Sequence, residues 1–149
     1  MSNLVTGGGG FLGRHLVEQL VAQGESVRVF CRSEPGCLGL DNVTWFAGDV
    51  QDARAVAEAC HDITTIYHCA SLAGIWGKWS LYENTNVHGT RNLLEAATQS
   101  QVARFVYTSS PSVVFDGHDM IDADETRPLA RSFLCHYPRS KAIAETDVL

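Results

Sequence analysis

A run of four glycines near the start of the chain separates a short apolar segment from a helical pattern. It lies in Thr6–Gly13, after the strand-like Asn3–Val5 and before the amphipathic pattern Phe11–Val21. Glycines at such a turn let a phosphate approach the backbone, and the helix N-terminus offers it unpaired N–H groups. The evenly spaced glycines are Gly7, Gly10 and Gly13. Their G-x-x-G-x-x-G spacing is a variant of the dinucleotide fingerprint. A flexible turn is the simpler alternative, but the flanking strand and helix favour a phosphate site.

Short apolar strands alternate with helical patterns along the rest of the chain. Strands are expected at Ser26–Cys31, Val43–Ala47, Thr65–Cys69 and Arg104–Ser109, and helices at Ala53–Cys60, Tyr82–Ser100 and Cys135–Leu149. This alternation predicts parallel strands with right-handed crossovers and helices on both faces. We therefore predict one α/β domain over residues 1–149, a doubly wound Rossmann sheet of strand order 3-2-1-4-5. The last helical pattern has no stop signal, so we expect the chain to be cut within this helix.

The composition disfavours several other classes of protein. Lys plus Arg is 11 and Asp plus Glu is 17, and the resulting net charge of −6 disfavours a nucleic-acid partner. No apolar stretch is long enough for a membrane span and no secretory signal is visible, so a cytoplasmic protein is expected. The five cysteines and six histidines show no ligand spacing, so no metal site is expected. Cys31 and Cys69 fall in strand-like runs and are expected to be buried.

A tyrosine and a lysine four residues apart lie in the last helical pattern. Tyr137 and Lys141 share one helical face, where the ammonium group favours the phenolate form of the tyrosine. Such a tyrosine can exchange a proton with a carbonyl or a hydroxyl group near neutral pH. Ser110 follows the strand Arg104–Ser109 at the sheet edge where ligands bind, so its hydroxyl can bond to the same substrate oxygen. Each pattern alone also fits surface or strand-end residues without a catalytic role.

In this order, the motifs resemble the N-terminal half of an extended short-chain dehydrogenase/reductase, the superfamily that includes NAD-dependent epimerases and dehydratases. The matching segments are Thr6–Gly13, Gly48-Asp49-Val50, His68-Cys69-Ala70-Ser71, Asn86-Val87-His88-Gly89-Thr90, Thr108-Ser109-Ser110 and Tyr137–Lys141. The resemblance extends over essentially all 149 residues and implies an NAD(P)-dependent oxidoreductase. It also implies that the chain is truncated before the sixth strand and lacks the C-terminal substrate domain of that family. Ala73–Trp79 and Tyr137–Glu145 are most similar to the 3β-hydroxysteroid dehydrogenase-like branch, which includes 2-alkyl-3-oxoalkanoate reductases.

The resemblance also implies roles for individual residues. Tyr137 would be the general acid/base, Lys141 would hold the nicotinamide ribose, and Ser110 would orient the substrate oxygen. Asp49 would bind the adenine amine, whereas Asn86 would tie its helix to neighbouring backbone. The residues implied to contact the cofactor are Gly7, Gly10, Phe11, Leu12, Gly13, Arg32, Asp49, Val50, Cys69, Ala70, Ser71, Thr108, Tyr137 and Lys141.

Two features bear on the cofactor and the substrate. The second strand ends in Cys31-Arg32, without the carboxylate that an NAD site directs at the ribose 2′-hydroxyl. An arginine there suits a 2′-phosphate, so NADP is expected in preference to NAD. Ile75, Trp76 and Trp79 offer an apolar surface, which fits a bulky sterol-like or 3-oxoalkanoate-like substrate whose hydroxyl and ketone forms are interconverted.

Two other functions stay open at this point. A nucleotide-sugar epimerase or dehydratase shares the core motifs and would retain NAD, and an inactive nucleotide-binding fragment or regulatory module is the non-enzymatic alternative. The resemblance further implies a homodimer through the helices at 82–100 and 135–149, because a two-fold interface would bury their apolar faces. The other expected partner is a small-molecule substrate, with neither nucleic acid nor a membrane span.

Overall fold

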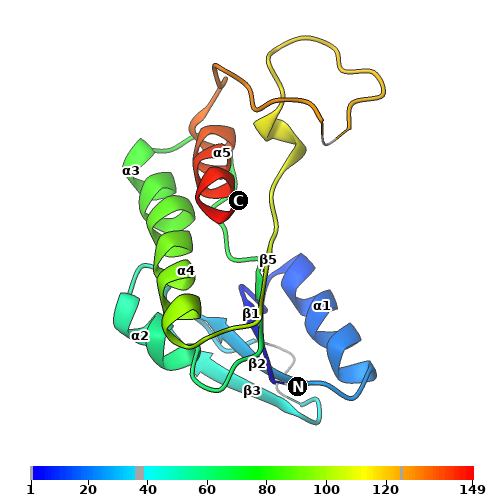
Figure 1. The fold of residues 1–149 in the computed structure, drawn as a ribbon, viewed down its shortest axis with the longest axis vertical. Helices are drawn as coiled ribbons and strands as arrows, with labels where there is room; N and C mark the ends of the chain where they lie inside the picture. Colours follow the sequence, from blue (N-terminus) through cyan, green and yellow to red (C-terminus); the bar gives the residue numbers. More distant parts are fainter. Residues whose placement is uncertain (1, 36–38, 125) are drawn as a thin grey trace.

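Five parallel strands form one sheet in the order β3-β2-β1-β4-β5, which confirms the predicted topology (Figure 1). The structure, a computed structural model, describes residues 2–35, 39–124 and 126–149. The strands are β1 (Ser2–Thr6), β2 (Ser26–Cys31), β3 (Val43–Ala47), β4 (Thr65–His68) and β5 (Arg104–Tyr107). β1 lies at the centre, and its last residue Thr6 pairs in register with Phe30 on one side and His68 on the other.

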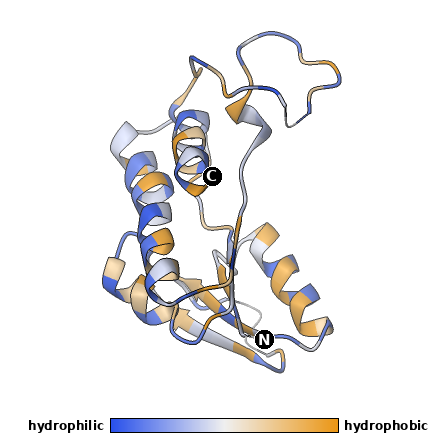
Figure 2. Cartoon of the chain, viewed as in Figure 1, coloured by the Kyte–Doolittle hydropathy of each residue, from blue (hydrophilic) through white to orange (hydrophobic). Residues whose placement is uncertain are grey.

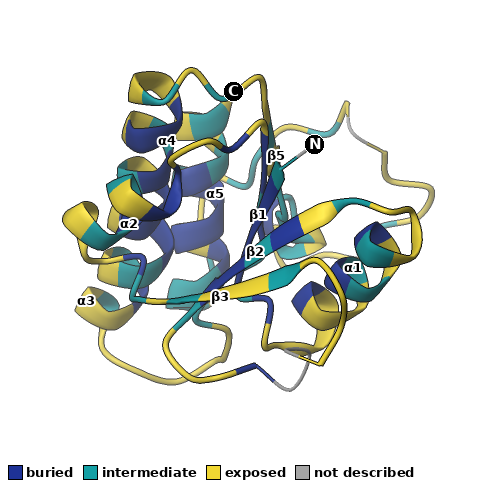
Figure 3. Cartoon of the chain, turned by 90° about the horizontal axis from the view of Figure 1, so that it is seen from below, coloured by how far each residue is buried: buried dark blue, intermediate teal, exposed yellow. Residues whose placement is uncertain are grey.

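Helices cover both faces of the sheet, as the strand–helix alternation predicts. They are α1 (Phe11–Ala22), α2 (Ala53–Ala59), α3 (Trp79–Tyr82), α4 (Gly89–Gln99) and α5 (His136–Val148), with a π-helical segment η1 (Glu83–His88) and a 3₁₀ turn η2 (Pro111–Val113). Figure 3 shows α1 on one side of the strands and α2, α4 and α5 on the other. Of the described helices, none is long and apolar enough to cross a membrane.

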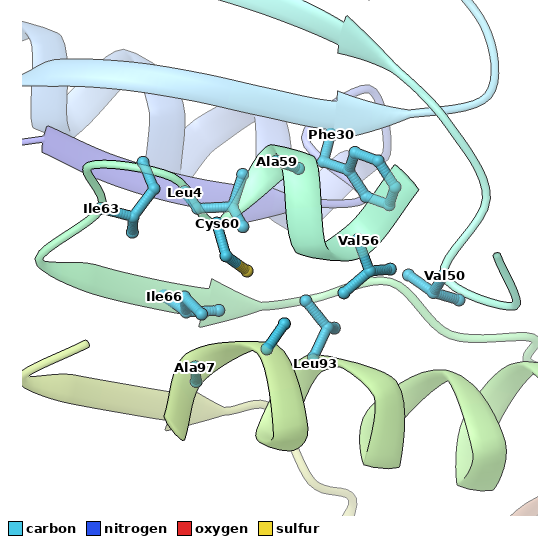
Figure 4. Packing of buried hydrophobic residues seen from close by; sticks show 11 residues of the cluster. Leu4, Phe30, Val50, Val56, Ala59, Cys60, Ile63, Ile66, Leu93 and Ala97 are labelled. Atoms are coloured by element: carbon cyan, nitrogen blue, oxygen red, sulfur yellow. The ribbon is translucent and has the colours of Figure 1, made fainter. Parts of the chain in front are cut away.

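The two faces of the sheet bury separate apolar clusters because successive strand side chains point in opposite directions. Leu4 of β1 joins Ile66 of β4 and Leu93 of α4 in the larger cluster, which fills the space between the sheet, α2 and α4 (Figure 4). The next residue, Val5, packs instead with Val17 of α1. Figure 2 shows hydrophilic and hydrophobic residues interspersed along α1 and α4, as in helices that bury one face. The packing of these clusters holds the carboxyl ends of the strands in place.

The helix predicted at Tyr82–Ser100 differs from the observed one at its start. Helical structure begins at Trp79 and passes through η1 before α4 starts at Gly89. Asn86, in the middle of η1, is 2 % exposed and bonds to the backbone of Leu72 through both its amide oxygen and its amide nitrogen. Such π-helical turns occur where tertiary contacts draw a residue out of α-helical register. The expected role of Asn86 as a tie to neighbouring backbone is confirmed.

Three predictions about the strand ends need correction. β4 and β5 end at His68 and Tyr107, before the predicted Cys69 and Ser109. Cys31 and Cys69 are half-buried rather than buried. Cys31 is the last residue of β2 and Cys69 directly follows β4, and both line a cavity at this edge of the sheet, which leaves them partly exposed. Beyond η2 the chain forms a long loop that extends past α5, coloured yellow to orange in Figure 1.

Candidate active site

A cavity of about 340 Å³ opens at the carboxyl ends of β1, β2, β3 and β4. In an open parallel sheet this edge is where ligands bind, beside the point at which the strand order reverses. The lining residues come from four strand-end loops and from η1. They are Gly7, Gly9, Gly10, Phe30, Cys31, Arg32, Ser33, Glu34, Gly48, Asp49, Val50, Cys69, Ala70, Ser71 and Thr85.

The glycine turn between β1 and α1 forms one wall of the cavity. Gly7 has φ +68°, and a Cβ added there would lie 2.8 Å from Cα of Ala70. A Cβ on Gly13 would lie 2.3 Å from the carbonyl oxygen of Gly7, so Gly13 lets α1 approach the turn. The N-cap of α1 is Gly10, which provides no side-chain cap. The first N–H groups of α1 are therefore available to an anion.

An arginine and an aspartate face each other at the mouth of the cavity. Nη1 of Arg32 lies 4.0 Å from Oδ2 of Asp49, and the Arg32 side chain is 79 % exposed. The other carboxylate oxygen of Asp49 accepts a hydrogen bond from the backbone N–H of Gln51. An exposed ion pair of this length contributes little to stability. Arg32 can therefore leave Asp49 for a ligand anion at small cost.

The sequence-predicted cofactor residues fall into two groups in the structure. Those that line the cavity are Gly7, Gly10, Arg32, Asp49, Val50, Cys69, Ala70 and Ser71. Phe11, Leu12, Gly13, Thr108, Tyr137 and Lys141 lie outside its lining. Among these, the Phe11 side chain is 86 % exposed and the Leu12 side chain is 50 % exposed. The lining residues not expected from the sequence to contact the cofactor are Gly9, Phe30, Cys31, Ser33, Glu34, Gly48 and Thr85. All but Thr85 lie within two residues of an expected one, whereas no sequence signal points to Thr85.

Lys141 is buried next to the end of β5. It is 3 % exposed, and its Nζ donates a hydrogen bond of 2.6 Å to the backbone carbonyl of Thr108. Burial lowers the pKa of Lys141 to about 8. The negative charge of Glu145 acts in the other direction, because it favours the ammonium form. A lysine with a pKa near neutrality is typical of sites that move protons.

Tyr137 and Ser110 lie near Lys141 in the fold without mutual hydrogen bonds. Tyr137 is half-buried in the first turn of α5, and η2, which Ser110 caps, packs against α5. The hydroxyl groups of Ser110 and Ser112 are 2.7 Å apart. Among the described residues, no hydrogen bond joins the Tyr137 hydroxyl to Ser110 or to Lys141. The structure thus packs η2, which Ser110 caps, against the helix that carries Tyr137 and Lys141.

A buried hydrogen-bond bridge connects η1 to the helix that carries Tyr137. The amide nitrogen of Asn86 donates to the Ser140 hydroxyl at 2.8 Å, and that hydroxyl donates to the backbone carbonyl of Tyr137 at 2.7 Å. Both Asn86 and Ser140 are buried. The first turn of α5 is thereby fixed relative to the loop that follows β4.

His68, the last residue of β4, links this strand to β1 and to α4. Its Nδ1 lies 2.7 Å from the Thr6 hydroxyl of β1, and its Nε2 lies 3.0 Å from the Thr90 hydroxyl of α4. Burial, followed by the nearby charge of Lys141, lowers the pKa of His68 to about 3. The imidazole is therefore neutral, and its two ring nitrogens hold β1, β4 and α4 together.

A parallel sheet of this order, with a glycine turn and a cavity at its carboxyl edge, defines a Rossmann-type nucleotide-binding domain. Comparison with known proteins narrows this class. The chain belongs to the 3-beta hydroxysteroid dehydrogenase/isomerase family, whose profile matches residues 4–149.

Individual relatives agree with this assignment. A 2-alkyl-3-oxoalkanoate reductase of Shewanella oneidensis is 39 % identical over 145 residues, which are 97 % of this chain and 38 % of the relative. A short-chain dehydrogenase/reductase superfamily protein of Agrobacterium tumefaciens with bound NAD is 29 % identical, at a TM-score of 0.89 over 99 % of this chain and 44 % of that one. UDP-glucose 4-epimerase of Thermus thermophilus, in complex with NAD, is 31 % identical at a TM-score of 0.87 over 99 % and 50 %. The chain thus spans half or less of the length of these proteins.

Proposed function

We propose that this chain is the nucleotide-binding and proton-transferring part of an NAD(P)-dependent oxidoreductase that interconverts a hydroxyl and a ketone. The observation that carries the proposal is the cavity at the uncapped N-terminus of α1. A side chain at Gly7 would collide with Ala70, so the turn keeps its backbone open toward the cavity. This cradle fits a pyrophosphate, with Gly7, Gly10 and the first N–H groups of α1 as its donors.

The chemistry is divided between the cofactor and the side chains of this chain. Hydride transfer to or from the substrate carbon is the chemistry that a nicotinamide would supply when bound. The Tyr137 hydroxyl donates a proton to the substrate oxygen in reduction and removes it in oxidation. Lys141 places a buried positive charge one helical turn away, which stabilises the phenolate that forms. Ser110 donates a hydrogen bond to the same oxygen and orients it.

The proposed substrate is bulky and apolar, in the manner of a sterol or a 2-alkyl-3-oxoalkanoate. The loop after β4 presents Ile75 at 68 % exposure and Trp76 at 90 % exposure, and Tyr82 fixes this loop through a hydrogen bond to the Trp76 carbonyl. Large exposed apolar side chains on an anchored loop mark a binding surface for an apolar partner. The matched relative that acts on an alkyl-substituted oxoalkanoate supports the same class.

NADP is the proposed cofactor in preference to NAD. Arg32 is exposed at the cavity mouth, and its weak pairing with Asp49 leaves the guanidinium available for a 2′-phosphate. The solved relatives described above contain NAD, so the preference rests on Arg32 and on the absence of a carboxylate at Cys31. A homodimer through the helices at 82–100 and 135–149 and a cytoplasmic location are part of the same proposal.

A second candidate is a nucleotide-sugar epimerase or dehydratase, because the epimerase of Thermus thermophilus shares this fold at 31 % identity. Such an enzyme reuses its NAD and retains it through purification. Release of nucleotide from the denatured, freshly purified protein would favour this alternative. A protein that is purified empty and binds NADPH reversibly would favour the oxidoreductase.

The proposal is tested by titrating this chain with NADPH and following the nicotinamide fluorescence. We expect saturable binding that Gly13→Ala weakens by at least about tenfold, because the added Cβ would displace the Gly7 carbonyl. Gly39→Ala is the matched control, since a Cβ there meets no atom within 4 Å. Equal affinity in both variants would show that the glycine turn does not hold the nucleotide.

A further inference from the structure

The Lys141 ammonium has few polar partners for a buried cation. An ammonium group carries three N–H donors. One donates to the Thr108 carbonyl at 2.6 Å, and no other acceptor for this ammonium is found among the described residues. A buried charge that is not fully satisfied by hydrogen bonds loses its proton readily. Another group must therefore help to keep Lys141 charged at 3 % exposure.

Tyr107, the last residue of β5, supplies such a group. Nζ of Lys141 lies over the Tyr107 ring, 3.9 Å from its centroid. The Tyr107 hydroxyl, at the other end of the side chain, donates to the backbone carbonyl of Lys141 at 3.5 Å. The same side chain thus contacts Lys141 at both its ammonium and its backbone. Burial, followed by the negative charge of Glu145, raises the pKa of Tyr107, so the phenol stays neutral.

The end of β5 holds α5 through consecutive residues. After Tyr107, the Thr108 carbonyl accepts from Lys141, and the Ser109 hydroxyl donates to the carboxylate of Glu145. These contacts tie Lys141 to the strand rather than to the cavity lined by the glycine turn. The lysine therefore has a defined place before any ligand arrives.

We propose that Tyr107 is a positioning residue, whose ring face holds the ammonium of Lys141 beside the carboxyl end of β5. The electron-rich ring face takes the place of missing hydrogen-bond acceptors, and such a contact is strongest where water is excluded. The consequence for catalysis rests on the proposed function, because there the Lys141 charge would serve Tyr137 and the nucleotide. The contact itself does not depend on that function.

Other charged and titratable groups around Lys141 also affect its pKa, so a test must leave them unchanged. Within α5 they are Glu145, whose carboxylate favours the ammonium, and Tyr137. From β4 and the residue after it they are His68, which is buried and neutral, and Cys69. On α4, Arg91 is paired with Asp147 of α5. A substitution at Tyr107 that keeps the shape of the ring leaves all of these in place.

The two lysines of the sequence, Lys78 and Lys141, make the test direct. Isotope-labelled lysine gives two side-chain signals in NMR, and the exposed Lys78 is an internal control. The pKa of Lys141 is measured in the unliganded chain with Tyr107→Phe, and again with a trifluorinated phenylalanine at the same position. The fluorinated ring has nearly the same size, but its face no longer carries the negative potential that attracts a cation. We expect Tyr107→Phe to titrate near the unsubstituted chain, and the fluorinated variant to titrate about one pH unit lower.

An unchanged or raised Lys141 pKa in the fluorinated variant would overturn the proposal. Tyr107→Leu is the second variant, and the Lys141 pKa should fall by a similar amount there. If Tyr107→Leu does not fold, the comparison between Tyr107→Phe and the trifluorinated variant decides the question. A parallel NADPH titration separates this inference from the proposed function. A shifted Lys141 pKa without any nucleotide binding would support the role of Tyr107 and contradict the oxidoreductase. Nucleotide binding without a shift of the Lys141 pKa would support the oxidoreductase and contradict the role of Tyr107.

Discussion

The neutral, buried His68 makes the folded chain sensitive to mild acid. Its pKa is lowered from 6.5 to about 3 by burial, whereas in the unfolded chain it returns to the ordinary value. Below pH 6.5 His68 therefore binds a proton in the unfolded state but stays neutral in the folded state. The free energy of unfolding falls as the pH is lowered through this range. At pH 5 the solution is about 1.5 pH units below the pKa of His68 in the unfolded chain. Protonation of the unfolded state therefore lowers the free energy of unfolding by about 2 kcal/mol.

The measurement is urea unfolding followed by circular dichroism at several pH values between 7.5 and 5. His68→Gln removes the titrating group, so its stability should depend much less steeply on pH in this range, although it is less stable throughout. His61→Gln is the matched control, because His61 is exposed and the slope of the unsubstituted chain should be kept. An equal loss in the free energy of unfolding of the chain and the His68→Gln variant between pH 7.5 and 5 would contradict this role of His68.

Three further outcomes are expected. Arg32→Ala should weaken NADPH binding by about 1.5–3 kcal/mol while NADH binding stays unchanged, and an equal loss for both nucleotides in calorimetry would contradict the role of the 2′-phosphate. Tyr137→Phe should abolish most turnover without changing nucleotide affinity, and a near-normal kcat would exclude Tyr137 as the acid/base. Leu94→Arg combined with Ile143→Arg, which charges half-buried apolar residues of α4 and α5, should convert a dimer into monomers in light scattering. A chain that is already monomeric at high micromolar concentration would contradict the dimer.

Strand positions were predictable because period-two and helical patterns are local properties of the sequence. Ser26–Cys31 and Val43–Ala47 are strands with the predicted bounds, and the parallel order follows from the alternation of strands and helices. The start of the long helix was not predictable in this way. The apolar spacing that indicates the later helix says nothing about Asn86, whose bonds to Leu72 and Ser140 link segments distant in the sequence.

The candidate site shows the same division between local and distant determinants. The glycine turn is visible in the sequence because a positive φ at Gly7 and the close approach at Gly13 demand glycine locally. The contribution of Thr85 to the cavity depends on how η1 is placed, and the contact between Lys141 and Tyr107 depends on how α5 crosses β5. Neither arrangement leaves a signal in residue spacing. Motif positions therefore identified candidate residues, whereas the environment of each one had to come from the fold.

The central claim is that a nicotinamide dinucleotide binds along the carboxyl edge of the sheet, from the glycine turn toward Lys141. Amide NMR of the chain during titration with NADPH tests it most directly. We expect saturable shifts at Gly7, Gly10 and Asp49, together with a shift of the Lys141 side-chain signal at the same nucleotide concentration. Saturable shifts confined to another face of the domain, or none at millimolar NADPH, would contradict it.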